Sequence, residues 1–186
     1  GNFGDVYAGY LAKKIGLPIN KFVVATNQND ILHRAITNGA YNVENVLETI
    51  SPSMDIQIAS NFERLIFDLN DHSDKKTIAV MKGIKEKGKY EIQKESLDKI
   101  NVDFLSSRMD EIEVLNTIKT VYEKFDKVLD PHSAIGYGAF DKVNLKGNNV
   151  VLATAHPCKF PSAIEKAINK KAELPDELFF ILDEKE

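Results

Sequence analysis

The sequence predicts an α/β fold, with a layered and largely parallel sheet flanked by helices. Two short apolar runs, at residues 21–26 and 149–153, are rich in β-branched side chains, which is typical of strands buried on both faces. Segments with apolar residues at helical spacing lie before, between and after these runs. Strands that alternate with helices in this way favour a parallel sheet covered by helices.

Helices are expected in segments whose ends hold recognisable start or stop residues. A helix that begins at Asn29 or Asp30 ends before Gly39, which tolerates the left-handed conformation of a helix end. Asp130 can cap a later helix, and Pro131 suits the first turn of that helix. Helical periodicity also marks residues 5–15, 61–69, 75–86, 111–125, 162–170 and 175–182.

Two stretches have a less regular pattern. Residues 41–58 are expected to be irregular, with a turn at residues 51–53 (Ser-Pro-Ser). Residues 84–99 are rich in lysine and glutamate, so we expect them to form a solvated face.

The composition narrows the class of protein. The chain has 186 residues, of which 43% are hydrophobic and 28% charged, which suits one globular domain or the larger piece of a bigger one. Its net charge is -4 and neither sign dominates a long stretch, so we expect no nucleic-acid and no membrane partner. The single cysteine, Cys158, excludes a disulfide within the chain and is compatible with a reducing compartment, so we expect a cytoplasmic protein.

The opening residues, Gly1-Asn2-Phe3-Gly4-Asp5, form a candidate anion site. They lead directly into a helix, whose first N–H groups have no partners and whose dipole places positive charge at that end. Two glycines let the backbone approach a phosphate closely. An ordinary glycine turn before a helix is the alternative, because short glycine patterns are common. The chain opens inside this motif with no strand before it, so we also expect it to be a fragment of a longer protein.

Six blocks of the sequence closely resemble the threonine synthases, in the same order as in that family. They are residues 1–14 (GNFGDVYAGYLAKK), 25–32 (ATNQNDIL), 47 with 51–56 (SPSMDI), 60–65 (SNFERL), 130–134 (DPHSA) and 153–160 (ATAHPCKF). The first and last blocks are the most specific. Residues 71–110 match least, and Cys158 stands where a small residue such as alanine is expected.

The resemblance implies that residues 1–186 are the C-terminal, cofactor-binding portion of a tryptophan-synthase-β-like fold (fold type II), with pyridoxal 5'-phosphate (PLP) between two α/β domains. It implies a lyase of threonine biosynthesis that converts O-phospho-L-homoserine and water to L-threonine and phosphate, as a monomer or dimer. The cofactor-binding residues implied are Gly1, Asn2, Phe3, Gly4 and Asp5 for the phosphate, and Thr154 for the pyridine nitrogen.

The family's Schiff-base lysine lies well before the glycine loop, so the resemblance implies that residues 1–186 contain no catalytic residue and are inactive alone. His132 and Arg64 are candidates for the site wall or for binding substrate; a salt bridge with Glu63, Asp68 or another acid is the plainer role for Arg64. The histidines are not spaced as metal ligands, so we expect no metal. A related PLP-dependent amino-acid lyase and a non-catalytic phosphate-binding module remain the alternatives.

Overall fold

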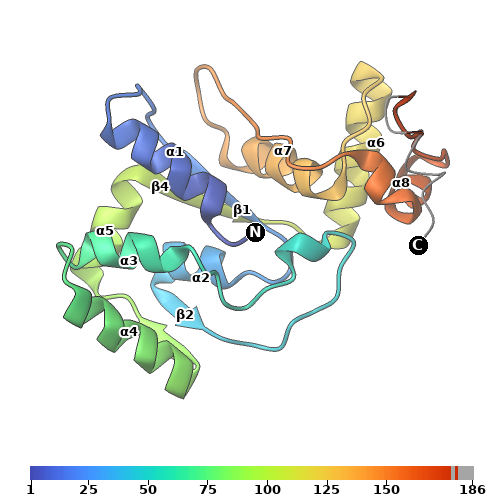
Figure 1. The fold of residues 1–186 in the computed structure, drawn as a ribbon. Coiled ribbons are helices and arrows are strands. Elements are labelled where there is room, and N and C mark those ends of the chain that lie inside the picture. Colours follow the sequence, from blue (N-terminus) through green and yellow to red (C-terminus); the bar gives the residue numbers. More distant parts are fainter. Residues whose placement is uncertain (177–178, 180–186) are drawn as a thin grey trace.

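The computed structural model of the protein describes residues 1–176 and residue 179 (Figure 1). Helices, strands and short 3-10 helices (η) follow one another in this order: α1 (Gly4–Lys14), β1 (Phe22–Thr26), α2 (Ile31–Asn38), β2 (Ala40–Asn42), η1 (Pro52–Met54), α3 (Phe62–Leu69), α4 (Asp74–Lys87), β3 (Lys89–Glu91), α5 (Lys94–Asp103), β4 (Phe104–Arg108), α6 (Glu111–Phe125), α7 (Pro131–Val143), η2 (Pro157–Lys159) and α8 (Pro161–Ile168). Within that part of the chain, none of the helices combines the length and the apolar character that crossing a membrane requires.

A parallel pair of strands, β1 and β4, lies at the centre of the fold. The register runs from Phe22 opposite Phe104 to Thr26 opposite Arg108, and a smaller antiparallel pair joins β2 to β3. Both α2 and α7 contact both parallel strands. Figure 1 shows α3, α4 and α5 toward one end of the molecule and α6, α7 and α8 toward the other. The predicted α/β class with parallel strands is confirmed.

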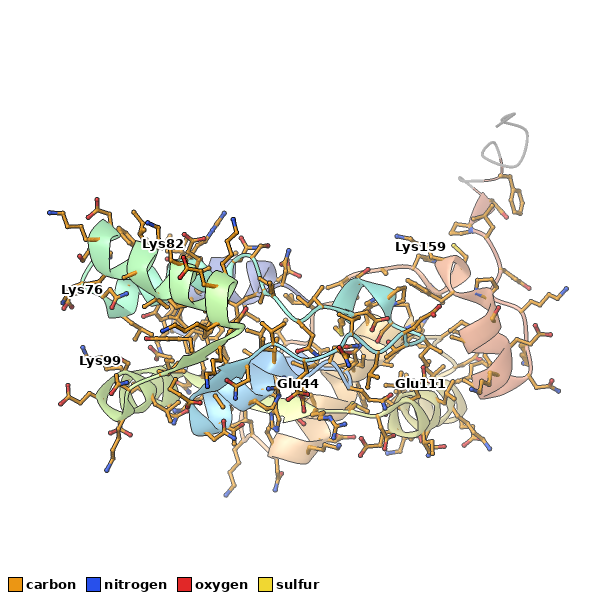
Figure 2. The ribbon with its side chains drawn as sticks, turned by 90° about the horizontal axis from the view of Figure 1, so that it is seen from below. Glu44, Lys76, Lys82, Lys99, Glu111 and Lys159 are labelled. Atoms are coloured by element: carbon orange, nitrogen blue, oxygen red, sulfur yellow. The ribbon has the colours of Figure 1, made fainter. Side chains whose placement is uncertain are left out.

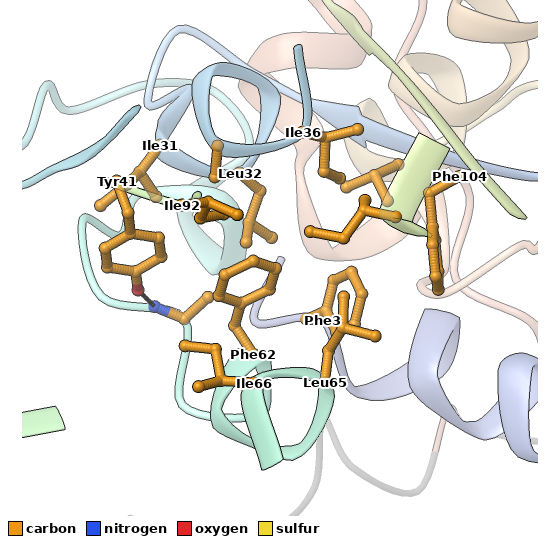
Figure 3. Packing of buried hydrophobic residues seen from close by; sticks show 14 of the residues in the cluster. Phe3, Ile31, Leu32, Ile36, Tyr41, Phe62, Leu65, Ile66, Ile92 and Phe104 are labelled. Carbon is orange, nitrogen blue, oxygen red and sulfur yellow. Dashed lines mark hydrogen bonds between the residues drawn. The ribbon is translucent and has the colours of Figure 1, made fainter. Parts of the chain in front are cut away.

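The two faces of β1 belong to two different hydrophobic cores. Val24 belongs to the core that Figure 3 shows, whereas its neighbour Ala25 packs against the core formed by α6, α7 and α8. Successive side chains of a strand point to opposite faces, so β1 is covered on both sides, as its apolar sequence predicts. In the first core the ring of Tyr41 stacks on Phe62 with centroids 5.4 Å apart, and its hydroxyl accepts a hydrogen bond from the amide of Ala59 at 2.9 Å.

The helices predicted from periodicity and caps within the described residues are confirmed, with ends that differ by a residue or two. Gly39 ends α2 in the left-handed conformation, with φ of 81°. Asp130 caps α7, and Pro131 occupies its first turn. The helix expected at residues 175–182 falls largely on residues 177, 178 and 180–182, which lie outside the described part of the chain.

The prediction of a buried strand at residues 149–153 is wrong. This segment is irregular, and Val150 and Leu152 are 86% and 56% exposed. A strand needs a neighbour to pair its backbone groups, and within the described residues this segment pairs with neither β1 nor β4. The segment has the composition of a buried strand but no neighbouring strand within the described residues.

The lysine-rich region forms β3 and α5, which the sequence pattern did not reveal. Its charged side chains point to solvent as expected, and Figure 2 shows Lys99 of α5 on this surface. Three isoleucines, Ile84, Ile92 and Ile100, instead point inward and join the first core. They fix the β3 and α5 segment against α2 and β2.

Candidate functional site

The loop at residues 1–5 is closed by its own side chains and tied to α3. The Asn2 side-chain oxygen accepts a hydrogen bond from the amide of Gly4 at 3.1 Å, and the Asn2 carbonyl accepts one from the amide of Asn61 at 3.1 Å. The side-chain nitrogen of Asn2 takes no part in the first bond, so it can donate to a ligand. The next N–H groups of α1, those of Asp5 and Val6, belong to the helix turn that has no internal acceptors.

Phe3 anchors this loop to the core. Its ring is 3% exposed and lies 5.3 Å from the ring of Phe62 and 5.7 Å from that of Phe104, measured between centroids. Its backbone is left-handed, with φ of 73°, a conformation that costs an L-residue about 1–2 kcal/mol. Burial of an aromatic ring offsets that cost. The loop is therefore held in a strained shape while Asn2 and Asp5 on either side of Phe3 stay exposed.

The two glycines allow a close approach that other residues would block. A Cβ on Gly4 would lie 3.0 Å from the Asn2 side-chain oxygen and 3.3 Å from the Asn61 amide nitrogen, and a Cβ on Gly1 would lie 3.3 Å from the Ser53 carbonyl oxygen. The helix N-terminus and two asparagine side chains thus border a glycine-lined cradle, which is a donor set suited to a phosphate group.

A buried carboxylate at the start of α7 forms the second part of the site. Asp130 is 1% exposed and accepts hydrogen bonds from the amide of His132 at 2.9 Å and from the amide and hydroxyl of Ser133. Burial alone would raise the pKa of Asp130, but the hydrogen bonds from His132 and Ser133 outweigh it and hold the pKa below its ordinary value. Asp130 is therefore a charged cap in the interior.

His132 joins this carboxylate to the segment beside the loop. Its Nδ1 lies 3.0 Å from the Asp130 carboxylate, and its Nε2 lies 3.2 Å from the amide nitrogen of Ser53, which follows the first residue of η1. The ring also faces Phe160 with centroids 4.9 Å apart. The side chain is only 4% exposed, so it forms part of the protein wall.

Thr154 lies beside the start of α7, although no strand precedes it. Its amide donates to the Ser133 hydroxyl at 3.3 Å, and the residue as a whole is exposed. The opening loop and Thr154 are therefore connected by a series of contacts: hydrogen bonds run from Ser53 through His132, Asp130 and Ser133 to Thr154, and Ser53 lies beside Gly1, where an added Cβ would be 3.3 Å from the Ser53 carbonyl oxygen.

A buried polar cluster after β1 escaped the sequence reasoning. The Asn27 side-chain amide lies 2.7 Å from the Asp55 carboxylate and 2.9 Å from the hydroxyls of Thr49 and Ser51. Asn29 donates to the same carboxylate at 2.9 Å. These bonds hold residues 49–55, and with them Ser53, against the carboxyl end of β1. The sequence signal for this cluster is the pair of asparagines directly after a buried strand, because ligands in α/β folds bind at the carboxyl edge of the sheet.

Arg64 lies on the first turn of α3, next to α1. Its guanidinium lies 6.0 Å from the centre of the Tyr7 ring, and within the described residues it makes no ion pair with Glu63 or Asp68. The salt bridge expected for Arg64 is thus not found. Asp68 pairs instead with Lys14 at 3.1 Å.

A groove of about 510 Å³ lies elsewhere, between His33, Arg108 and Lys142. Its cations are already paired: Arg108 lies 3.3 Å from Asp30, and Lys142 lies 2.6 Å from Glu113. It includes none of the site residues predicted from the sequence.

Comparison with known proteins identifies relatives along the whole chain. The family model described as threonine synthase, C-terminal, matches residues 133–186. Threonine synthase of Pseudomonas aeruginosa is 40% identical over all of this chain, which covers 40% of that protein. The crystal structure of PLP-bound threonine synthase from Brucella melitensis superposes with a TM-score of 0.94 at 44% identity, and that of threonine synthase from yeast with 0.90 at 38%. All of this chain is covered in both superpositions, with 40% and 42% of those chains.

The chain thus spans about 40% of the length of the relatives that it matches. The matched region includes the glycine loop, the start of α7 and Thr154, which are the parts joined by the series of contacts described above. This chain is similar to the threonine synthases along its whole length, and its residues 133–186 match the model of their C-terminal part.

Proposed function

We propose that this chain is the cofactor-binding C-terminal part of a threonine synthase, which converts O-phospho-L-homoserine and water to L-threonine and phosphate with PLP as cofactor. The observation that supports this best is the series of contacts between the glycine loop and Thr154. A ligand with a phosphate at one end and a polar ring atom at the other suits two such linked sites. When bound, PLP supplies an electron sink for bond breaking at the substrate.

The residues of the loop fit the phosphate of this cofactor. Gly1 and Gly4 border a cradle that a Cβ would narrow, and the side-chain amides of Asn2 and Asn61 lie at its edge. The N–H groups at the start of α1 add donors and the positive end of the helix dipole. Phe3 contributes through its buried ring, which holds the loop in place, and Asp5 through its backbone amide.

Thr154 is the residue that we assign to the pyridine nitrogen. Its backbone amide is held by Ser133, and its side-chain hydroxyl makes no hydrogen bond within the described residues, so the hydroxyl is available to a ligand. A hydroxyl is a neutral partner and cannot keep a proton on that nitrogen as a carboxylate could. Thr154 would therefore leave the ring largely neutral and favour elimination over other reactions of the same cofactor.

Arg64 is the candidate for the substrate's phosphate. It is exposed, lies on the helix that is bonded to the loop through Asn61, and has no ion-pair partner within the described residues. A guanidinium forks well onto phosphate oxygens. His132, by contrast, already uses both ring nitrogens within the protein, so we assign it to the wall of the site.

The proposal includes a cytoplasmic location and a monomer or dimer, which stay predictions. A related PLP-dependent amino-acid lyase would share the loop and Thr154, and a non-catalytic module would share only the loop. The substrate that is turned over distinguishes a threonine synthase from a related lyase. Any turnover at all distinguishes it from a non-catalytic module.

The direct test is an assay of the purified full-length protein with PLP and O-phospho-L-homoserine. We expect threonine and phosphate in equal amounts, and no turnover with O-phosphoserine. The polypeptide of residues 1–186 is the control, and it should show only the background of free cofactor, because the resemblance places the attachment lysine outside it. Turnover by the full-length protein of O-phosphoserine alone would refute the substrate assignment, and no turnover at all would refute the activity.

A further inference from the structure

We infer that Asp130 and His132 form a positioning unit that sets the distance between the glycine loop and Thr154, and thus between the two ends of the bound cofactor. The identity of the cofactor in this inference rests on the proposed function. The geometry of the unit rests on the hydrogen bonds at the start of α7.

The protonation of His132 follows from its two partners. Nε2 lies 3.2 Å from a backbone N–H, that of Ser53, so this nitrogen must accept. Nδ1 lies 3.0 Å from the Asp130 carboxylate, which only accepts, so this nitrogen must hold the proton and donate it. In this tautomer the proton lies on Nδ1. A flip of the ring would place carbon atoms against both partners and lose both hydrogen bonds.

The other arm of the unit passes through Ser133. Because the carboxylate of Asp130 can only accept, the Ser133 hydroxyl donates to it and keeps its lone pairs for the amide of Thr154. One buried carboxylate thus orients an imidazole toward Ser53 and a hydroxyl toward Thr154. Ser53 in turn lies under Gly1, where an added Cβ would be 3.3 Å from the Ser53 carbonyl oxygen.

The unit sits where it cannot easily relax. The side chains of Asp130 and His132 are 0% and 4% exposed, and the ring of Phe160 covers the imidazole. On the opposite side, Asn27 and Asp55 hold the segment that contains Ser53 against the end of β1. A change in either arm is therefore expected to move the atom at the end of that arm, because the surroundings do not adjust.

The two arms can be tested separately by two substitutions of one residue. The amide of asparagine reaches about as far as Nδ1 of histidine, so His132→Asn keeps the bond to Asp130 and loses the bond to Ser53. The amide of glutamine reaches about as far as Nε2, so His132→Gln keeps an acceptor for Ser53. In the full-length holoenzyme, we expect His132→Asn to weaken PLP binding about tenfold, since a buried donor is left unpaired, and His132→Gln to restore most of it.

The Ser133 arm has its own readout. Ser133→Ala removes the acceptor for the amide of Thr154 but leaves His132 and the loop in place. We expect the absorption maximum of the bound cofactor and its pH dependence to change, while the affinity for PLP changes less than threefold. His72→Asn is the matched control: His72 makes a similar contact with Asp68, at 3.0 Å, but it is exposed and makes no direct contact with the loop or with Thr154. It should change neither affinity nor spectrum.

Equal losses of PLP affinity in His132→Asn and His132→Gln would show that the side chain only fills space, and the inference would be wrong. No loss in either variant, or a Ser133→Ala spectrum identical to that of the unsubstituted protein, would also overturn it. If His132→Asn fails to fold, Ser133→Ala alone decides. These readouts are binding and absorption, so they remain informative even if O-phospho-L-homoserine is not the substrate.

Discussion

At the scale of single residues, the proposed site depends on small groups whose backbone is held by other residues. Thr154 shows this most clearly, because its amide is bonded to Ser133 while its side chain makes no hydrogen bond within the described residues. Its hydroxyl is thus free for a ligand, and its position does not depend on that hydroxyl. Phe3 is the reverse case, since its side chain is buried and its backbone shapes the loop.

Thr154→Val should therefore separate catalysis from stability. Valine keeps the shape of threonine and the amide bond to Ser133 but removes the hydroxyl that we assign to the pyridine nitrogen. In the full-length enzyme we expect turnover to fall at least about tenfold, as for loss of a positioned hydrogen bond. The free energy of unfolding should change by no more than about 0.5 kcal/mol, because the residue is exposed. Steady-state kinetics and urea unfolding measure both; an unchanged rate and cofactor spectrum would exclude the assignment.

The sequence alone proposes residues for the site but does not reveal how they are connected. The glycine loop, Thr154 and His132 are candidates from the sequence. The bond between Ser53 and His132 joins positions 79 residues apart, and no local pattern predicts such a contact. Asp130 was recognised only as a helix cap, because its second role depends on which residues the fold brings to it.

At the scale of elements, local signals predicted helices well and strands less well. Caps and stops such as Asp130 and Gly39 act within a few residues of their helix, so the sequence reveals them. A strand depends on a distant neighbour, and β4 is paired with β1 from more than 80 positions away. The apolar run 149–153 has strand composition but no neighbour within the described residues, so it stays irregular and exposed.

This contrast predicts a difference in hydrogen exchange. In the full-length protein, we expect the region that relatives carry beyond the matched part to provide a neighbouring strand, so the amides of Val150, Val151 and Leu152 should exchange slowly. In the polypeptide of residues 1–186 the same amides should exchange within seconds, because they are unpaired and exposed. The amides of β1 serve as the control and should be protected in both. Fast exchange of residues 150–152 in the full-length protein would contradict the prediction.

At the scale of the whole molecule, the chain has two hydrophobic cores joined by the β1–β4 pair, with the glycine loop near the middle. Figure 1 shows the N-terminus between α1 and α7, near the middle of the molecule. This placement brings the helix dipole of α1, the polar cluster after β1 and the buried carboxylate of α7 to one region. Each has a separate structural role, and together they leave a glycine-lined cradle at one end and the Thr154 hydroxyl at the other.

The most direct measurement is a crystal structure of the full-length protein grown with PLP. We expect the phosphate of PLP on the amides of residues 1–5, with its pyridine nitrogen within hydrogen-bonding distance, about 2.7–3.2 Å, of the Thr154 hydroxyl. The bonds from Ser53 to His132 and from Thr154 to Ser133 should be retained. Cofactor density elsewhere with an empty loop, or a ring nitrogen paired with another residue while Thr154 faces solvent, would contradict the central claim that the loop and Thr154 hold the two ends of one cofactor.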